Sequence, residues 1–226
     1  MFAPFFIAMG WGAALAFPIS FTKWYGSGGV SKVTKHSSGD RSLSTKVFFD
    51  TEFTDLLGIA QDPALISIGL ITEDGKRTFY AELTDTYTLE QCSDFVHAGV
   101  LPLLDAPELP EVLDLTAIYA RVSATQCRDL LTQWLEQGGK HTELWSDAPS
   151  YDWHFVVELF HEHVWPDLLS RTPRSCLPTE EASVSRRFRY VEQMYATQRF
   201  RRHHAMDDAR VNREVWLVES AERQRS

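Results

Sequence analysis

Two acidic residues lie two positions apart at the end of an apolar run. Val47, Phe48 and Phe49 precede Asp50, and Glu52 follows after a single threonine. On a β-strand, alternate residues project to the same face, so the two carboxylates would lie side by side. Like charges this close repel unless a cation neutralises them, and carboxylate oxygens suit Mg²⁺ or Mn²⁺. The pair therefore predicts a metal site. A solvent-exposed strand end is the alternative, because the pattern is short.

Two further acidic segments follow later in the chain. Asp152, in the pair Tyr-Asp, lies at the expected start of a helix over residues 152–163. Asp208 ends the stretch His203-His-Ala-Met-Asp-Asp, near the expected start of a helix over residues 206–220. Because all three acidic segments lie at the edges of expected elements, they could converge on one site.

The order of these segments resembles a known family. DxE, then Tyr-Asp about 100 residues later, then HxAxxD near the C-terminus is the pattern of the DEDDh 3′–5′ exonucleases. The stretches FFDTEFTD, ALISIGLITEDG, FYAEL and SYDW are most similar to the small bacterial 3′–5′ exoribonuclease group of that superfamily. The resemblance covers roughly residues 47–220. It implies an α/β fold, with an RNase H-like mixed β-sheet flanked by helices.

The resemblance also implies roles for individual residues. It implies that His203 is the general base and that four acids are metal ligands, namely Asp50, Glu52, Asp152 and Asp208. Ala205 fixes the register of the HxAxxD motif. It selects His203 rather than His204 as the base, and Asp208 rather than Asp207 as the ligand.

Two positions depart from the pattern of many family members. Asp147 stands where many members have Asn, which adds a negative charge close to the expected site. Phe53 stands where the proofreading enzymes usually have Thr. The resemblance implies that Phe53 and Thr54 line the pocket for the terminal nucleotide, so these positions bear on the choice between DNA and RNA.

The residue types fit phosphodiester hydrolysis. The reaction needs a nucleophile at neutral pH and a stabilised leaving oxygen, and two metal ions about 3.5–4 Å apart can provide both. A histidine with an ordinary pKa of about 6.5 can take the proton of the water. We therefore expect two Mg²⁺ ions, or Mn²⁺, and a 3′–5′ exoribonuclease that releases nucleoside monophosphates from single-stranded RNA. The alternatives are a 3′–5′ DNA exonuclease of the repair or proofreading type and a catalytically silent nucleic-acid-binding module.

A basic segment precedes the HxAxxD motif. Residues 184–202 contain six arginines and one glutamate, interleaved with aromatic residues, a composition that suits phosphate contacts and base stacking. The predicted substrate contacts in this segment are Arg186, Arg187 and Arg189. The alternative is a solvated helix face over an aromatic core.

Charge and cysteine content exclude several classes of protein. The formal net charge of −9 argues against a protein that coats nucleic acid non-specifically. Three cysteines without a CxxC spacing predict neither a disulfide framework nor a Cys-based zinc site, and they favour a reducing compartment. We therefore expect a cytoplasmic protein. Family resemblance adds a homodimer as one option for its assembly.

The N-terminal part of the chain differs from the rest. Residues 1–22 contain no charge and are mostly apolar, and the following residues to 46 are rich in Ser, Gly and Lys and read as a linker. The apolar segment is interpreted as a dispensable extension, with a membrane anchor and a signal peptide as alternatives. An anchor would tether the body in the cytoplasm through contact of residues 1–22 with the membrane. The exonuclease domain is expected over residues 47–226.

The remaining pattern predicts the elements that must position these residues. Apolar β-rich runs predict strands that end at Asp50 and that cover residues 64–71, 77–83 and 143–145, with a hairpin turn at Asp74-Gly75. Helical spacing predicts five helices, over residues 89–104, 125–137, 152–163, 184–200 and 206–220. This order of elements suggests a mixed sheet flanked by helices.

Overall fold

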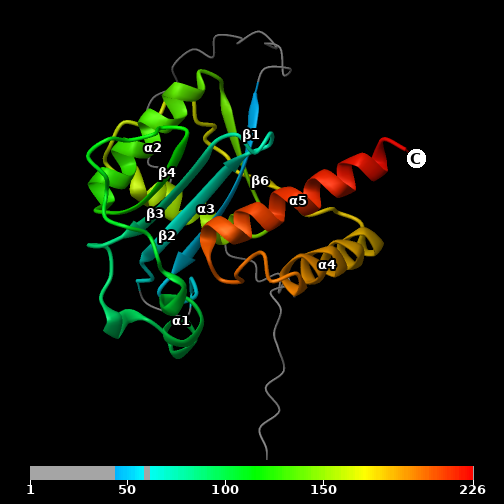
Figure 1. Ribbon diagram of the computed structural model, residues 1–226, viewed down its shortest axis with the longest axis horizontal. Coiled ribbons are helices and arrows are strands. Elements are labelled where there is room, and N and C mark those ends of the chain that lie inside the picture. The colour runs from blue at the N-terminus through cyan, green and yellow to red at the C-terminus, as the bar shows by residue number, and fades with distance from the viewer. Residues whose placement is uncertain (1–43, 59–61, 226) are drawn as a thin grey trace, which may run out of the picture. The chain divides into compact units, whose positions relative to one another are not determined.

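The described part of the protein is one α/β unit. The computed structural model describes residues 44–58 and 62–225, and they belong to a single compact unit (Figure 1). Within these residues, a six-stranded mixed sheet is flanked by five α-helices. This confirms the predicted fold class, and the arrangement is consistent with an RNase H-like sheet. Most of the N-terminal segment discussed above, residues 1–43, lies outside the described residues.

The sheet combines antiparallel and parallel pairs. Its strands are β1 (Thr45–Phe53), β2 (Leu65–Thr72), β3 (Thr78–Leu83), β4 (Ala117–Val122), β5 (Thr142–Ser146) and β6 (Arg174–Ser175). Their order is β4-β3-β2-β1-β5-β6. The pairs β1–β2 and β2–β3 are antiparallel, and the other three are parallel. The predicted turn at Asp74-Gly75 joins β2 to β3, and Gly75 supplies the positive φ of 72° that this turn requires.

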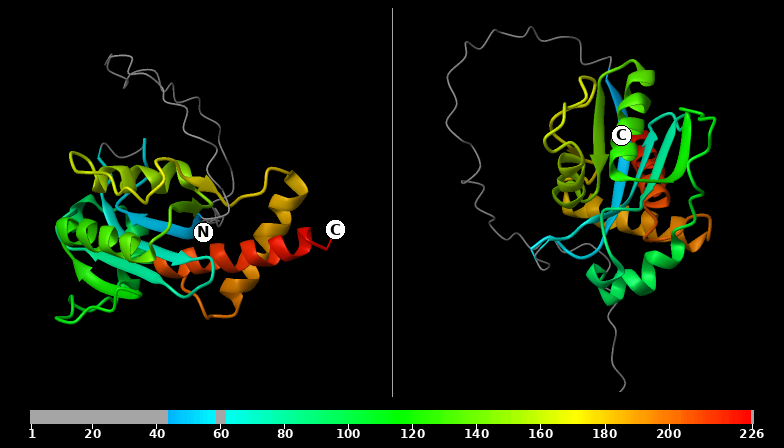
Figure 2. Two further views of the ribbon diagram at one scale, coloured as in Figure 1. Left: turned by 90° about the horizontal axis from the view of Figure 1, so that it is seen from above. Right: turned by 90° about the vertical axis from the view of Figure 1, so that its left-hand side faces the viewer.

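Helices cover both faces of the sheet. They are α1 (Asp94–Gly99), α2 (Ala124–Gly138), α3 (Pro149–Leu159), α4 (Glu181–Ala196) and α5 (Ala205–Arg223). Residues of α2 and α3 pack in one apolar cluster with one face of the sheet, and α5 packs on the other face. The left-hand view of Figure 2 shows α3 and α5 on opposite sides of β1. None of the helices formed by residues 44–58 and 62–225 is long and apolar enough to cross a membrane.

Two parts of the predicted element list are wrong. The continuous helix expected over residues 89–104 is instead two 3₁₀ turns on either side of the short helix α1. Ser93 caps α1 through its side chain, and Pro102 lies in the second turn, so the chain changes direction at both points. Strands β4 and β6 were not predicted. Burial alternates along β4, but its sequence AIYARV is apolar at every position except Arg121 and so shows no alternation of polar and apolar residues, and β6 has only two residues.

A glycine allows α5 to lie close to the sheet. Gly69, in the middle of β2, pairs with Asp50 of β1. A Cβ atom at Gly69 would lie only 2.4 Å from the backbone nitrogen of Met206 and 2.5 Å from the carbonyl carbon of Ala205. No other residue type fits this approach. The start of α5 is thereby held directly over β2, beside the acidic residues of β1.

Candidate metal centre

Strand β1 presents both acids of the DxE pair to the α5 side of the sheet. The strand continues to Phe53, so Asp50 and Glu52 lie within it rather than after its end. Val47 and Phe49 belong to the apolar cluster under α2 and α3, and the alternation of a strand directs Asp50 and Glu52 to the opposite face. Glu52 is only 8% exposed, so the alternative of a solvent-exposed strand end does not apply to it.

The second acidic segment joins this site from the first turn of α3. Asp152 is 2% exposed and accepts two hydrogen bonds from Thr51, at 3.2 Å from its backbone nitrogen and 2.7 Å from its hydroxyl. The hydroxyl of Ser146, the last residue of β5, donates to the other carboxylate oxygen. Asp147 follows Ser146 directly. Asp152 is therefore fixed between two neighbouring strands.

The third segment enters at the start of α5. The side chain of His204 caps this helix, which places His203 just outside it and Asp208 in its first turn. Asp208 accepts a hydrogen bond from the backbone nitrogen of His203 at 3.0 Å and another from the hydroxyl of Tyr195. His203 has a positive φ of 66°, a conformation that costs a non-glycine residue roughly 1–2 kcal/mol. Strained backbone of this kind is often found at functional sites.

The three segments meet. One ligand atom from each of Glu52, His203 and Asp208 lies within 4.8 Å of the other two. The same holds for Asp50, Asp147 and Asp152. The structure thus brings together the predicted general base and all four predicted metal ligands, together with Asp147. We call the five carboxylates the acidic cluster: Asp50, Glu52, Asp147, Asp152 and Asp208.

Burial and mutual repulsion set the electrostatics of the acidic cluster. Burial is the largest cause of the raised pKa of Asp50, and the charges of Asp152 and Asp208 raise that pKa further. Burial, followed by the same two charges, raises the pKa of Glu52. Burial also raises the pKa values of Asp152 and Asp208 to about 7, against the hydrogen bonds that favour their charged forms. A bound cation would relieve these costs.

His203 is suited to accept a proton. Burial, and then the positive charge of Arg202, lowers its pKa below 6.5, so the imidazole is neutral at pH 7. The ring of Phe95, in α1, packs edge-on against it with 4.8 Å between ring centroids. His203 therefore sits beside the acidic cluster as a neutral base between α1 and α5.

The neighbouring His204 and Asp207 face a different environment. Burial raises the pKa of Asp207, but hydrogen bonds from Arg201 outweigh it and hold the pKa below its usual value. Arg201 and Arg210 lie 2.7 and 3.1 Å from this carboxylate. His204 is 1% exposed and stacks on Tyr80. The motif register implied by Ala205 selects His203 and Asp208, and these are the two residues that lie at the acidic cluster. His204 and Asp207 instead contact arginines and Tyr80.

The three arginines that were predicted to contact substrate differ in their burial. Arg187 is 2% exposed and its guanidinium is bound by Glu219 at 3.0 Å, so the prediction that it contacts substrate phosphate is wrong. The sequence did not reveal this burial, because the partner lies on another helix. Arg186 and Arg189 are exposed on α4, and Arg186 forms an ion pair with Glu222 at 3.3 Å.

The two residues after Glu52 also differ from each other. Thr54 is 1% exposed, and its hydroxyl accepts a hydrogen bond from the backbone nitrogen of Ala64 at 2.9 Å. Its predicted role in lining a nucleotide pocket is therefore wrong, because its side chain anchors a loop. Phe53 is half-buried and stacks on Phe155 with 4.8 Å between ring centroids, and its role at the terminal nucleotide stays a prediction.

Sequence reasoning missed several residues that support the acidic cluster. Tyr195 is one of the aromatic residues of segment 184–202, whose composition suits base stacking, but its hydroxyl donates to Asp208 instead. Arg202 lies over the ring of Tyr195, 4.4 Å from its centroid, and is the basic residue adjacent to His203 in the chain. The position of Arg202 next to the HxAxxD motif was the available signal. Nothing local in the sequence pairs Tyr195 with Asp208.

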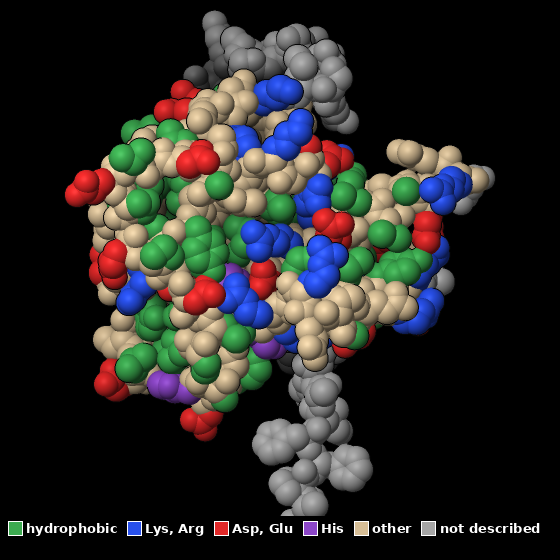
Figure 3. All heavy atoms as spheres, in the orientation of Figure 1, with side chains coloured by type: hydrophobic (Ala, Val, Ile, Leu, Met, Phe, Trp, Pro, Cys, Tyr) green, Lys and Arg blue, Asp and Glu red, His purple; other side chains and the backbone are tan. Residues whose placement is uncertain are grey.

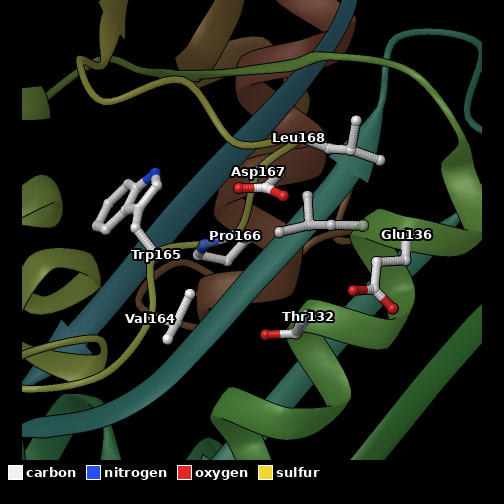
Figure 4. A pocket seen from close by; sticks show the side chains of 8 residues that line it. Thr132, Glu136, Val164, Trp165, Pro166, Asp167 and Leu168 are labelled. Carbon is white, nitrogen blue, oxygen red and sulfur yellow. The ribbon is translucent and has the colours of Figure 1, made fainter.

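Charge and hollows are distributed unevenly over the surface. On the face shown in Figure 3, Lys and Arg side chains are numerous over α4 and α5, and acidic side chains over the side of α1 and α2. A hollow of about 170 Å³ lies between α2 and residues 164–168 (Figure 4). Mainly apolar groups line it, together with Glu136 and Asp167, and it is on the sheet face opposite the acidic cluster. It therefore adds nothing to this site.

In comparisons with known proteins, the chain matches no protein-family model and no curated protein.

Proposed function

We propose that this protein is a metal-dependent 3′–5′ exoribonuclease. The observation that carries the proposal is the acidic cluster itself, in which five carboxylates meet beside the neutral imidazole of His203. Asp50, Glu52 and Asp152 are not paired with Lys or Arg by any ion pair among the described residues. Collecting buried carboxylates without a cation is costly, and sites that bind cations are where this cost is offset.

The donor set fits a hard divalent cation. All of the acids offer oxygen, which Mg²⁺ and Mn²⁺ prefer, and the described residues place no cysteine among them. Asp50, Glu52, Asp152 and Asp208 would hold the ions. When bound, such ions would neutralise the charge that develops on the phosphate and lower the pKa of water.

The protein's own groups would do the remaining work. His203 would accept the proton of the attacking water, since its imidazole is neutral at pH 7. Tyr195 and the backbone nitrogen of His203 would keep Asp208 in place. Arg202, whose side chain is 36% exposed, forms an ion pair with Glu192 at 2.7 Å and would exchange this partner for a phosphate group of the substrate.

The proposed preference for RNA rests on the sequence motifs. It derives from the resemblance of FFDTEFTD and ALISIGLITEDG to the exoribonuclease group of the DEDDh family. What supports it is the correspondence between that motif pattern and the residues that converge here. A DNA substrate remains an outcome of the test below.

The test is digestion of matched single-stranded RNA and DNA oligomers that are labelled at both ends. We expect Mg²⁺-dependent release of mononucleotides from the 3′ end of RNA, and slower release from DNA. Asp208→Asn is the inactive control. Faster digestion of DNA would replace RNA by DNA in the proposal. An absence of Mg²⁺- or Mn²⁺-dependent cleavage of either polymer would overturn it in favour of a silent binding module.

A further inference from the structure

Arg187 is the centre of a buried polar chain that leads to the acidic cluster. Its guanidinium lies between α4 and α5, where it donates to Glu219 at 3.0 Å and to Asn212 Oδ1 at 2.9 Å. It also donates to Cys176 Sγ at 3.1 Å. Asn212 is 4% exposed, so this network is closed to solvent. A surface cation for substrate would not be bound in this way.

The chemistry of the guanidinium fixes the orientation of the Asn212 amide. An arginine side chain has only donors, so the group that Asn212 turns toward it must be the carbonyl oxygen. The amide nitrogen must then face the other way, where it lies 2.9 Å from Asp147 Oδ1. Among the described residues, no other group donates to the carboxylate of Asp147.

We propose that Asn212, oriented by Arg187, is a positioning residue that holds Asp147 as an additional carboxylate of the metal centre. This inference rests on the proposed function. Asp147 already has a carboxylate oxygen within 4.8 Å of ligand atoms of Asp50 and Asp152. Binding one of its oxygens to Asn212 limits the rotation of the carboxylate and keeps it among these acids. Arg187 thus acts on the metal centre through Asn212, although its own helix, α4, contributes no carboxylate to the acidic cluster.

The size of the expected effect follows from similar arrangements. Residues that orient a metal ligand typically change metal affinity by about 10–100-fold when they are replaced. We therefore expect Asn212→Leu to weaken Mn²⁺ binding by about 10–100-fold. Asp147→Ala should weaken it by about the same factor, since it removes the carboxylate that Asn212 holds.

The experiment is a titration of the metal-free full chain with Mn²⁺ alone, in which electron paramagnetic resonance reports the free ion. A double-mutant cycle combines Asn212→Leu with Asp147→Ala. If Asn212 acts through Asp147, Asn212→Leu should have no further effect on Mn²⁺ affinity once Asp147 is replaced. Asn212→Ala is a second variant that adds no bulk to the buried site.

Cys176→Ala is the matched control. Cys176 is 4% exposed, as is Asn212, and accepts from the same arginine nitrogen, but among the described residues no hydrogen bond joins it to Asp147. Its Mn²⁺ affinity should stay within about twofold of wild type, because only a general loosening around Arg187 would affect it. An equal loss in Cys176→Ala and Asn212→Leu would overturn the positioning role.

The remaining outcomes separate this inference from the proposed function. If the wild type binds Mn²⁺ and Asp147→Ala binds it equally well, only the inference fails. That arm does not depend on the folding of the Asn212 variants, because Asp147 is half-exposed at the end of β5. If the wild type binds no Mn²⁺, the proposed function fails and the inference fails with it.

Discussion

Asp207 and Asp208 are consecutive residues in the first turn of α5, but their carboxylates have opposite surroundings. Asp207 lies within hydrogen-bonding distance of Arg201 and Arg210, and its pKa is below the usual value. Asp208 accepts from Tyr195 and a backbone nitrogen, faces other carboxylates, and has a pKa raised to about 7. The helix turns these neighbours about 100° apart, which separates the two environments.

The difference extends to the residues around them. Around Asp207 lies a paired cluster in which acids and bases alternate, made up of Asp105, Arg201, His204, Asp207 and Arg210. In the part of the chain that the structure describes, no Lys or Arg forms an ion pair with a member of the acidic cluster. Charges balanced within the protein need no ligand, and the paired cluster accordingly fixes the start of α5. The unbalanced charges of the acidic cluster are those that a bound cation can neutralise. Both clusters contain aspartate and histidine, so it is the presence or absence of arginine partners that distinguishes the structural cluster from the candidate metal site.

The largest expected effect comes from replacing one or the other aspartate. Asp208→Asn should reduce Mg²⁺-dependent cleavage by at least about 10³-fold, since metal ions contribute several kcal/mol to such reactions. Asp207→Asn should keep activity within about tenfold but lower the free energy of unfolding by about 1–3 kcal/mol, because it removes the charge that strengthens the part-buried hydrogen bonds from Arg201 and Arg210. Rates of oligomer digestion and thermal melts measure both. Equal losses of activity in the two variants would break the comparison.

The adjacent histidines provide the second test. His203→Ala should lose about 10²–10⁴-fold in turnover, as is typical when a general base is removed, while it still binds metal and RNA. The wild-type rate should rise as pH increases through the titration of His203, below pH 6.5 because its pKa is lowered, and this limb should vanish in the variant. His204→Ala should stay within about tenfold in turnover and melt at a lower temperature, because it leaves a cavity under Tyr80. A large loss of turnover in His204→Ala would reverse the assignment of base and metal ligand in HxAxxD.

The third test concerns pH and metal removal. Asp152 and Asp208 have pKa values of about 7 in the folded protein, compared with 3.8 for an ordinary aspartate. The metal-free folded state therefore binds more protons than the unfolded state, and its stability should fall as pH rises from about 4 to about 7. Added Mg²⁺ should raise the melting temperature more at pH 8 than at pH 5, because protons compete with the ion.

Glu52→Gln is the variant that isolates this repulsion. Among the described residues, no hydrogen bond to the Glu52 side chain would be lost, and one buried negative charge is removed. We expect the metal-free variant to melt at a higher temperature than wild type at pH 8, and to lose cleavage activity. Thermal melts in EDTA that show the same pH dependence for both proteins would contradict the electrostatic account.

The sequence predicted those parts of the molecule that local pattern encodes. The alternation in β1, the Asp74-Gly75 turn and the helical spacing in α2 and α5 each reflect neighbours in the chain, and the elements appear where expected. The motif order indicated which acids would meet. The short strand β6 and the breaks around α1 carry no such periodic signal.

Contacts between distant segments account for what the sequence did not predict. Whether an arginine on α4 faces solvent or Glu219 depends on the packing of two helices. The sequence gives no reason to distinguish three neighbouring arginines of the same type, so the same substrate contact was predicted for Arg186, Arg187 and Arg189. In the same way, the sequence does not show that the hydroxyl of Thr54 is bound by the backbone of Ala64, or that the hydroxyl of Tyr195 is bound to Asp208.

The smallest expected effect tests charge balance among these arginines. Arg189 is exposed on α4, whereas Arg187 is buried against Glu219. If Arg189 contacts one phosphate of RNA, Arg189→Ala should reduce the log–log slope of binding against salt by about 0.7 and leave the melting temperature unchanged. Arg187→Ala should instead destabilise the fold by about 3–5 kcal/mol, because Glu219 becomes a buried unpaired charge. Fluorescence anisotropy of a labelled RNA at several salt concentrations measures the slope. An unchanged slope in Arg189→Ala would place this residue away from RNA, and the same measurement on Arg199→Ala would then test the other exposed arginine of residues 184–202 that forms no ion pair among the described residues.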